Sequence, residues 1–153
     1  MDYSMLLLVL LGCPLAAALL IAVLPAKSTP RGAYETLHVL SLAGVAVAGL
    51  TLVVAAFAGS DIFALGEWFH LDGLSALFLG LIAVIAPCTG VYSLPYVAHD
   101  VAEGKLGPSQ VKQYYAFFSL FVFSMILAVT SNNIIIWLLY TSPSPRDRSV
   151  ARM

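Results

Sequence analysis

Four separate runs of mostly apolar residues constrain this chain more than any other feature of its sequence. They cover Met5–Leu24, about His38–Ala58, Leu74–Pro95 and Tyr114–Thr130. A helix that crosses a bilayer needs about 20 such residues. Because lipid offers the backbone no hydrogen-bond partners, each run must satisfy its own amides as a helix. The sequence therefore predicts an all-α fold, a polytopic membrane helical bundle with four full spans.

The composition points to the same solvent. Hydrophobic residues make up 61% of the 153 residues, and charged residues make up only 10%. A soluble domain carries about 25% charged residues, and a water-soluble globule of this composition would expose large apolar patches. We therefore expect the lipid bilayer to surround most of the chain. The net charge of −1 gives no sign of nucleic-acid binding.

The loop cations indicate an orientation. The loops after the first and third runs contain Lys and Arg residues, namely Lys27, Arg31, Lys105 and Lys112. The segments 1–4, 59–72 and 131–133 contain neither residue type. Because cytoplasmic loops are enriched in these cations, we expect a multi-pass protein of the cell inner (plasma) membrane with its N-terminus outside. The first run also has no cation before it and is long for a signal peptide, so we expect a retained helix.

The loop "GSDIFALGEWFHLDG" is too apolar to be a free linker. It predicts two short strand-like pieces that lie on the membrane interface, with Trp68 at headgroup depth. Asp72 directly precedes the third run, where its carboxylate can accept hydrogen bonds from the first helical turn. This structural role of Asp72 is favoured over an ion-binding role.

Two prolines, Pro14 and Pro87, fall inside the apolar runs. Each proline leaves one carbonyl of the preceding turn without its usual donor. Thr89 and Ser93 are expected to compensate near Pro87. Glycines at positions 80 and 90 are expected to let another helix approach the third run closely. These features favour a kinked third helix that packs inside a bundle.

Groups able to do chemistry are few. His38 stands at the edge of the second run, one turn after Glu35, and this pair favours a solvated helix end over half of a proton relay. His70 and His99 fall in opposite loops, so they are not expected to share a metal ion. The sequence has no zinc-site spacing, phosphate-binding glycine loop or nucleophile with a base. We therefore predict no catalytic residue, cofactor or metal site in this chain.

A fifth apolar run begins at Ile134 and stops at Tyr140. Seven helical residues rise only about 10 Å, whereas the hydrocarbon core is about 30 Å thick. The following residues, "TSPSPRDRSVARM", cannot complete the crossing, since prolines break helices and arginines are costly at the bilayer centre. The run predicts a truncated fifth span, and the tail at 138–153 is expected to be artefactual or disordered.

Two stretches carry a resemblance to a known family: "HLDGLSALFLGLIAVIAPCTGVYSLPYV" and "YYAFFSLFVFSMILAVTSNNIIIW". They resemble the N-terminal region of the antiporter-like membrane subunits shared by respiratory complex I, Mrp-type cation/proton antiporters and membrane-bound hydrogenases. The linker "YSLPYVAHDVAEGKLGPSQVKQYYAFF" resembles most the hydrogenase-4 component F branch. The resemblance covers about Met5 to Trp137, so residues 1–137 are expected to be the N-terminal part of such a subunit.

The resemblance implies a longer protein whose protons are carried by a glutamate in the fifth helix and by lysines in later helices. Where the family has Leu-Glu after the tryptophan, this chain has Leu139, Tyr140 and Thr141. No proton-carrying residue of the family can therefore be assigned here. Asp72 and Gly73 match a recurrent Asp-Gly-Leu-Ser motif of the family, whose role is read as structural.

Three functions are compatible with this reading. The first is an inactive fragment of a proton-translocating membrane subunit, whose partners are the other membrane subunits of a hydrogenase or complex I-like assembly. Such a subunit couples redox chemistry in its partners to ion movement and has no active site of its own. The second is a small four-helix membrane scaffold or assembly protein. The third, a self-sufficient channel, fits least because the spans offer no polar lining.

Overall fold

The computed structural model describes residues 3–25, 30–59, 62–64 and 69–131. Its elements are α1 (Tyr3–Val23), α2 (Arg31–Phe57), β1 (Ile62–Ala64), β2 (Phe69–Leu71), α3 (Gly73–Ala102) and α4 (Pro108–Thr130). All four helices are long and apolar enough to cross a membrane, which confirms the predicted helical membrane bundle. The fifth run, Trp68 and the tail lie outside the described residues.

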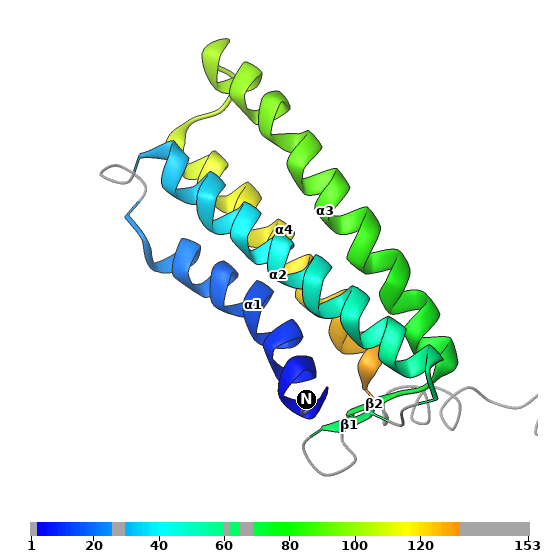
Figure 1. Cartoon of the computed structure of the whole chain (residues 1–153). Coiled ribbons are helices and arrows are strands. Elements are labelled where there is room, and N and C mark those ends of the chain that lie inside the picture. Colours follow the sequence, from blue (N-terminus) through cyan, green and yellow to red (C-terminus); the bar gives the residue numbers. More distant parts are fainter. Residues whose placement is uncertain (1–2, 26–29, 60–61, 65–68, 132–153) are drawn as a thin grey trace, which may run out of the picture.

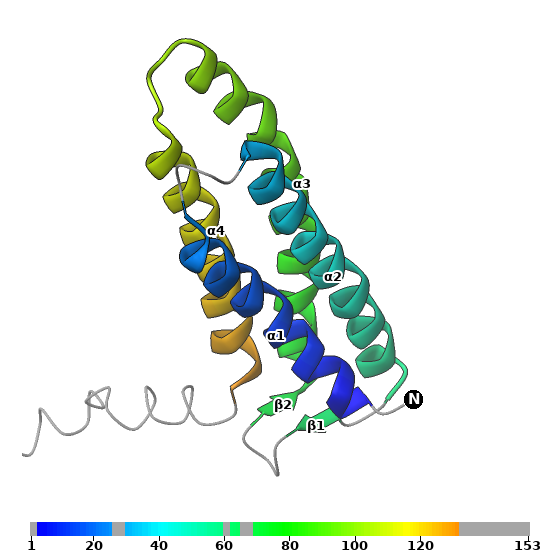
Figure 2. The ribbon, with the colours of Figure 1, turned by 90° about the vertical axis from the view of Figure 1, so that its left-hand side faces the viewer.

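The helices form one elongated bundle with two distinct ends (Figure 1). The connections from α1 to α2 and from α3 to α4 lie at one end, called here the loop end. The β1–β2 hairpin lies at the other end, called the hairpin end, together with the first turn of α1 and the last turn of α4 (Figure 2). Helix α1 packs against both α2 and α4, so the first and the last of the described helices contact each other.

Three helices are longer than the hydropathy predicts. Helix α2 begins at Arg31 instead of near His38, α3 continues to Ala102 instead of ending at Pro95, and α4 begins at Pro108 instead of at Tyr114. Hydropathy marks the part of a helix that lies in hydrocarbon, whereas polar turns continue the same helix into the interface. These turns are stabilised locally, for example by the Arg31–Glu35 ion pair at 2.5 Å.

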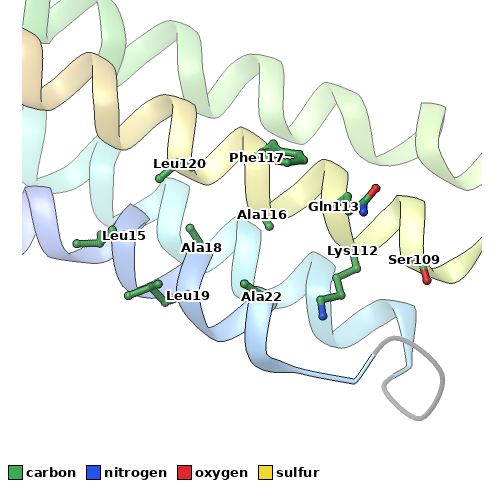
Figure 3. Close-up of a pocket in the computed structure, with 10 residues that line it drawn as sticks. All are labelled: Leu15, Ala18, Leu19, Ala22, Ser109, Lys112, Gln113, Ala116, Phe117 and Leu120. Atoms are coloured by element: carbon green, nitrogen blue, oxygen red, sulfur yellow. The ribbon is translucent and has the colours of Figure 1, made fainter.

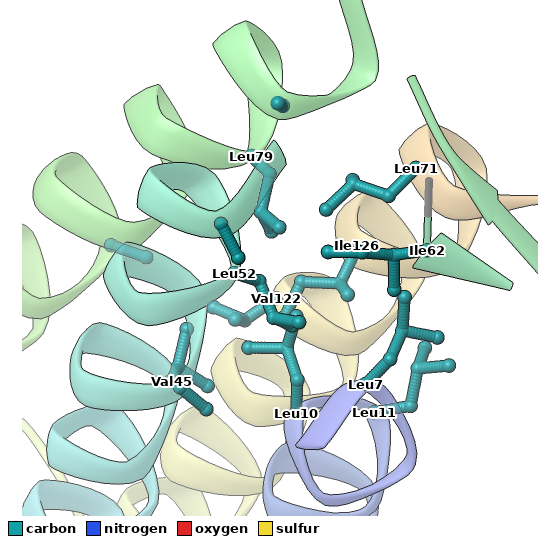
Figure 4. Close-up of a cluster of buried hydrophobic side chains, with 14 of the residues drawn as sticks. Leu7, Leu10, Leu11, Val45, Leu52, Ile62, Leu71, Leu79, Val122 and Ile126 are labelled. Carbon is teal, nitrogen blue, oxygen red and sulfur yellow. The ribbon is translucent and has the colours of Figure 1, made fainter. Parts of the chain in front are cut away.

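The hairpin confirms the two strand-like pieces expected in the 59–72 loop. Strands β1 and β2 pair antiparallel, with Ile62 opposite Leu71. Both of these side chains are about 1% exposed and lie against Leu79 and Ile126 at the hairpin end of the core (Figure 4). A further antiparallel bridge joins Phe69 to Ser131 just after α4. The hairpin thus covers the end of the bundle and contacts its last helix.

The buried side chains form two clusters along the bundle. The larger apolar core fills the hairpin end and the middle, and its fully buried members include Leu7, Leu10, Val45, Leu52, Leu79, Val122 and Ile126 (Figure 4). The smaller cluster fills the loop end and comprises Ile21, Tyr34, Val97, Val111 and Tyr115. Polar side chains interrupt the apolar packing where the two clusters meet.

Helices α2 and α3 approach each other through small residues. A Cβ atom on Gly49 would stand 2.8 Å from the Cβ of Ala83, and one on Gly90 would stand 2.2 Å from Leu42 Cδ1. Both glycines therefore permit contacts that a larger residue would block. The expected close approach at Gly90 is confirmed. At Gly80 it is wrong, since a Cβ there would meet Val53 at an ordinary 3.7 Å.

Helix α3 contains Pro87, and the expected compensation by neighbouring hydroxyls does not occur. The missing N–H of Pro87 would have bonded to the carbonyl of Ala83. Instead, the hydroxyl of Thr89 donates to the Ile85 carbonyl at 2.7 Å, and that of Ser93 donates to the Gly90 carbonyl at 2.7 Å. Hydroxyls in helices favour a carbonyl one turn back on their own chain, and neither of these two reaches the carbonyl that Pro87 leaves open.

Candidate functional site

His38 lies inside the bundle and not at a solvated helix end. Since α2 begins at Arg31, His38 stands about two turns within the helix, and its side chain is 0% exposed. The reading of His38 as part of a solvated helix end is therefore wrong. An ionisable side chain buried in a membrane helix is uncommon and marks a candidate functional site.

Three helices enclose the imidazole of His38. From α4, the rings of Tyr115 and Phe118 each have their centroids 4.9 Å from the His38 ring. From α3, a Cβ atom on Gly90 would stand 3.0 Å from His38 Nε2, so the backbone of α3 lies directly against the ring. A side chain at position 90 would compete with His38 for this space.

The polar atoms around His38 are buried without partners. Neither ring nitrogen of His38 forms a hydrogen bond within the described residues, and neither does the Tyr115 hydroxyl or the Ser119 hydroxyl. Tyr115 and Ser119 are one turn apart on the same face of α4. Each unpaired buried polar group costs about 1–3 kcal/mol. We call His38, Tyr115 and Ser119 the His38 cluster: Tyr115 contacts the His38 ring, and Ser119 lies one turn further along α4.

The surroundings of the His38 cluster differ at its two ends. Toward the loop end lies the Arg31–Glu35 ion pair, whose side chains are 35% and 25% exposed. Glu35 is also near enough to Tyr115 to interact with it electrostatically. Toward the hairpin end lies the larger core, which is mostly apolar from Leu42 and Val45 onward but also buries the Ser41 and Thr130 side chains. Charged side chains thus flank the His38 cluster on its loop-end side.

The length of α3 places the His38 cluster in the bilayer. Counted from Gly73, about 20 residues cross the hydrocarbon core, so the far boundary falls near Ser93. Tyr92 and Tyr96 are exposed there, with ring centroids 5.6 Å apart, as interfacial aromatic residues are. Gly90, which contacts His38, lies within the span. The His38 cluster is therefore inside the hydrocarbon region but close to its loop-end boundary.

Asp72 occupies the N-cap position of α3 at the hairpin end. The Ser75 N–H donates to Asp72 Oδ1 at 2.7 Å. Hydrogen bonds from the Ser75 side chain and backbone hold the pKa of Asp72 below its usual range, because they favour the carboxylate. A Cβ atom on Gly73 would meet nothing within 4 Å, and nothing in the described residues explains a glycine there. Pro87 lies about four turns further along α3, so these three residues do not form one site.

The other two histidines lie at opposite ends of the bundle. His70 is in β2 at the hairpin end, whereas His99 is in the last turn of α3, 3.2 Å from Glu103. In the described ranges, no group of three or more His, Cys, Asp or Glu side chains is placed to hold a metal ion.

Sequence reasoning missed the His38 cluster for a definable reason. Tyr115 and Ser119 looked unspecific because scattered hydroxyls are common in membrane helices. The signal lay in their i,i+4 spacing on the face of α4 opposite the exposed Phe117 and Phe121. Once α2 is extended back to Arg31, the same periodicity places His38 on the face that carries the buried Ser41 and Leu42.

The fold and the apolar helices define this chain as a multi-pass membrane protein. It is similar to the hydrogenase-4 component F homolog of Methylacidiphilum infernorum, with 35% identity over 69 residues that cover 45% of this chain and 14% of that protein. It is also similar to the NADH-quinone oxidoreductase subunit L of Campylobacter jejuni, with 34% identity over 65 residues that cover 42% of this chain and 10% of that protein.

These two similarities confirm the resemblance to the antiporter-like membrane subunits. No family model matches the chain, and no solved structure matches it. The matched stretches span about a seventh and a tenth of the length of the two relatives.

Proposed function

We propose that residues 1–137 are the N-terminal part of a proton-translocating membrane subunit. The parent complex is of the hydrogenase-4/formate hydrogenlyase or NADH:quinone oxidoreductase type, and its partner subunits supply the redox chemistry. The similarity to a hydrogenase-4 component F homolog, 35% identical over 69 residues, carries this proposal. The four apolar helices agree with such a membrane subunit.

The His38 cluster fits a part of such a subunit that handles protons without completing their path. A neutral imidazole holds one proton and accepts another, and the Arg31–Glu35 pair connects the cluster to the loop end. Toward the hairpin end, the described part of the buried core consists of apolar side chains and hydroxyls. A proton that reaches His38 must therefore continue through groups that later parts of the parent subunit supply.

The orientation is part of the same proposal. Arg31, Lys105 and Lys112 all belong to the loop end, and Asp72 belongs to the hairpin end. Under the positive-inside rule, the loop end faces the cytoplasm and the N-terminus faces outward, in the inner membrane. Cysteines placed at Lys105 and at Asp72 test this: an impermeant maleimide added to intact spheroplasts should label only the second.

A membrane scaffold or assembly protein is the second candidate. Two observations favour it. The four helices bury a shared core, and the hairpin contributes Ile62 and Leu71 to one end of that core. Purification from native membranes in mild detergent separates the two candidates. Hydrogenase or quinone-oxidoreductase subunits should co-purify with the tagged chain, and their absence from a stable preparation would refute the first candidate.

We further propose that residues 138–153 are foreign to the family sequence. The abrupt change from an apolar run to "TSPSPRDRSVARM" supports this. Sequencing of the genomic template across the Trp137 codon tests it. A continuous native reading frame into the tail would rule this proposal out while leaving the co-purification test intact.

A further inference from the structure

A groove of about 420 Å³ runs along the surface between α1 and α4 (Figure 3). The groove is open because the residues between the two helices are small alanines, whereas the residues beside them are larger. Ala18 and Ala22 on α1 and Ala116 on α4 form its floor. Alanines at i and i+4 lie on one helix face, so the floor is continuous along the groove.

The groove is apolar along most of its length and polar at one end. Leu15 and Leu19 from α1 and Phe117 and Leu120 from α4 form the apolar walls. Ser109, Lys112 and Gln113 form the polar end, on the first two turns of α4 (Figure 3). This end coincides with the loop end of the bundle, where the hydrocarbon core gives way to the headgroup region.

Lys112 is a half-buried cation without an acidic partner among the described residues. The other cations described are paired: Arg31 with Glu35 at 2.5 Å, and Lys105 with Glu103 at 2.5 Å. A charge placed at the mouth of an apolar groove attracts an anion. The ligand that fits must therefore combine a negative group at Lys112 with an apolar part along the walls.

We propose that this groove binds an anionic phospholipid. The lipid phosphate lies at Lys112, where Ser109 and Gln113 can donate further hydrogen bonds, and one acyl chain follows the walls toward Leu120. The eight residue steps from Lys112 to Leu120 give the acyl chain about 12 Å of groove. A protein helix is about 10 Å wide and does not fit between two helices that already contact each other.

This proposal does not depend on the proposed function, since it needs only a bundle that lies in a membrane. The full chain, purified in a neutral detergent, is titrated with phosphatidylglycerol or with phosphatidylcholine, and native mass spectrometry measures the bound lipid. The wild-type chain should retain phosphatidylglycerol in preference to phosphatidylcholine. Inorganic phosphate in excess should not displace the lipid, because it lacks the acyl chain.

Two variants test the two halves of the groove. Lys112→Gln should lower the affinity for phosphatidylglycerol at least about tenfold, the effect of losing one charge-assisted hydrogen bond. Ala22→Phe changes an exposed floor residue and should lower the retention of both lipids by filling the groove. Circular dichroism spectra unchanged from the wild type establish that both variants are folded.

The matched control is Lys105→Gln, which removes the same charge at the same end of the bundle but outside the groove. It should leave the affinity for phosphatidylglycerol within about twofold of the wild-type value, because surface charges contribute little. Equal losses in Lys105→Gln and Lys112→Gln would overturn the proposal in favour of general surface charge. No loss in Lys112→Gln, or displacement of the lipid by inorganic phosphate, would also overturn it.

Discussion

The close packing of α2 on α3 predicts opposite effects for two Gly→Ala substitutions. In Gly49→Ala, the new Cβ would stand 2.8 Å from Ala83 Cβ, whereas ordinary contacts begin near 3.4 Å. Ala83 Cβ has no rotatable end to move, so the two helices must separate by several tenths of an ångström. In Gly12→Ala, the new Cβ would meet nothing within 4 Å.

The magnitudes follow from two terms. Overpacking costs about 1–3 kcal/mol, and alanine is favoured over glycine in a helix by about 1 kcal/mol. The propensity gain applies to both variants, but the overpacking cost applies only to Gly49→Ala. We therefore expect Gly12→Ala to raise the free energy of unfolding by up to about 1 kcal/mol. Gly49→Ala should unfold about 1–3 kcal/mol more easily than Gly12→Ala.

Reversible unfolding in mixed micelles, followed by circular dichroism, measures both variants against the wild type. The comparison between the variants matters most, because helix propensity cancels in it. Equal free energies of unfolding for the two variants would refute the close approach of α2 to α3 at Gly49.

Three further predictions concern single polar groups. Asp72→Ala should lower the free energy of unfolding by about 1 kcal/mol near neutral pH, through loss of the N-cap. Because the folded-state pKa of Asp72 is lowered, its stabilisation is present above the usual carboxyl pKa and is lost as the pH falls through the lower folded value. An acid titration of stability should thus be flatter in Asp72→Asn than in the wild type. The Tyr34 hydroxyl donates to the Pro25 carbonyl at 3.2 Å, whereas the Tyr115 hydroxyl is buried without a partner. Tyr34→Phe should therefore cost about 0.5–1.5 kcal/mol in thermal unfolding while Tyr115→Phe costs nothing or stabilises, and the reverse order would contradict these assignments. His38→Leu removes two unpaired nitrogens and should stabilise the isolated bundle by up to about 2 kcal/mol. The same variant should impair proton translocation by the assembled parent complex, and a fully active stable variant would remove His38 from the proton path.

The apolar runs predicted the four membrane helices of the described residues and the class of fold, because burial in lipid imposes both on a chain of this composition. They did not predict where the helices end. Arg31 and Glu35 belong to α2, yet their polarity excludes them from a hydropathy window. The structure shows both residues in the helix, where they form an i,i+4 ion pair with each other.

The candidate site depended on those missed ends. If α2 started near His38, as the hydropathy predicts, the histidine would stand at an exposed helix end in contact with water. With α2 starting at Arg31, His38 turns onto the buried face beside Tyr115. Asp72 was easier to place, because a carboxylate directly before an apolar run is a local signal. The residues that contact His38 come from two other helices, α3 and α4, and helix packing of this kind is not local in sequence.

The contact between α1 and α4 determines the order in which the bundle can assemble. During synthesis, α1 and α2 can pair early, but the face of α1 that includes Leu15 and Ala18 has to wait for the fourth helix to enter the membrane. The Phe69–Ser131 bridge forms later still. Closure of the bundle is therefore an event near the end of its synthesis, and until then the first helix remains incompletely packed in lipid.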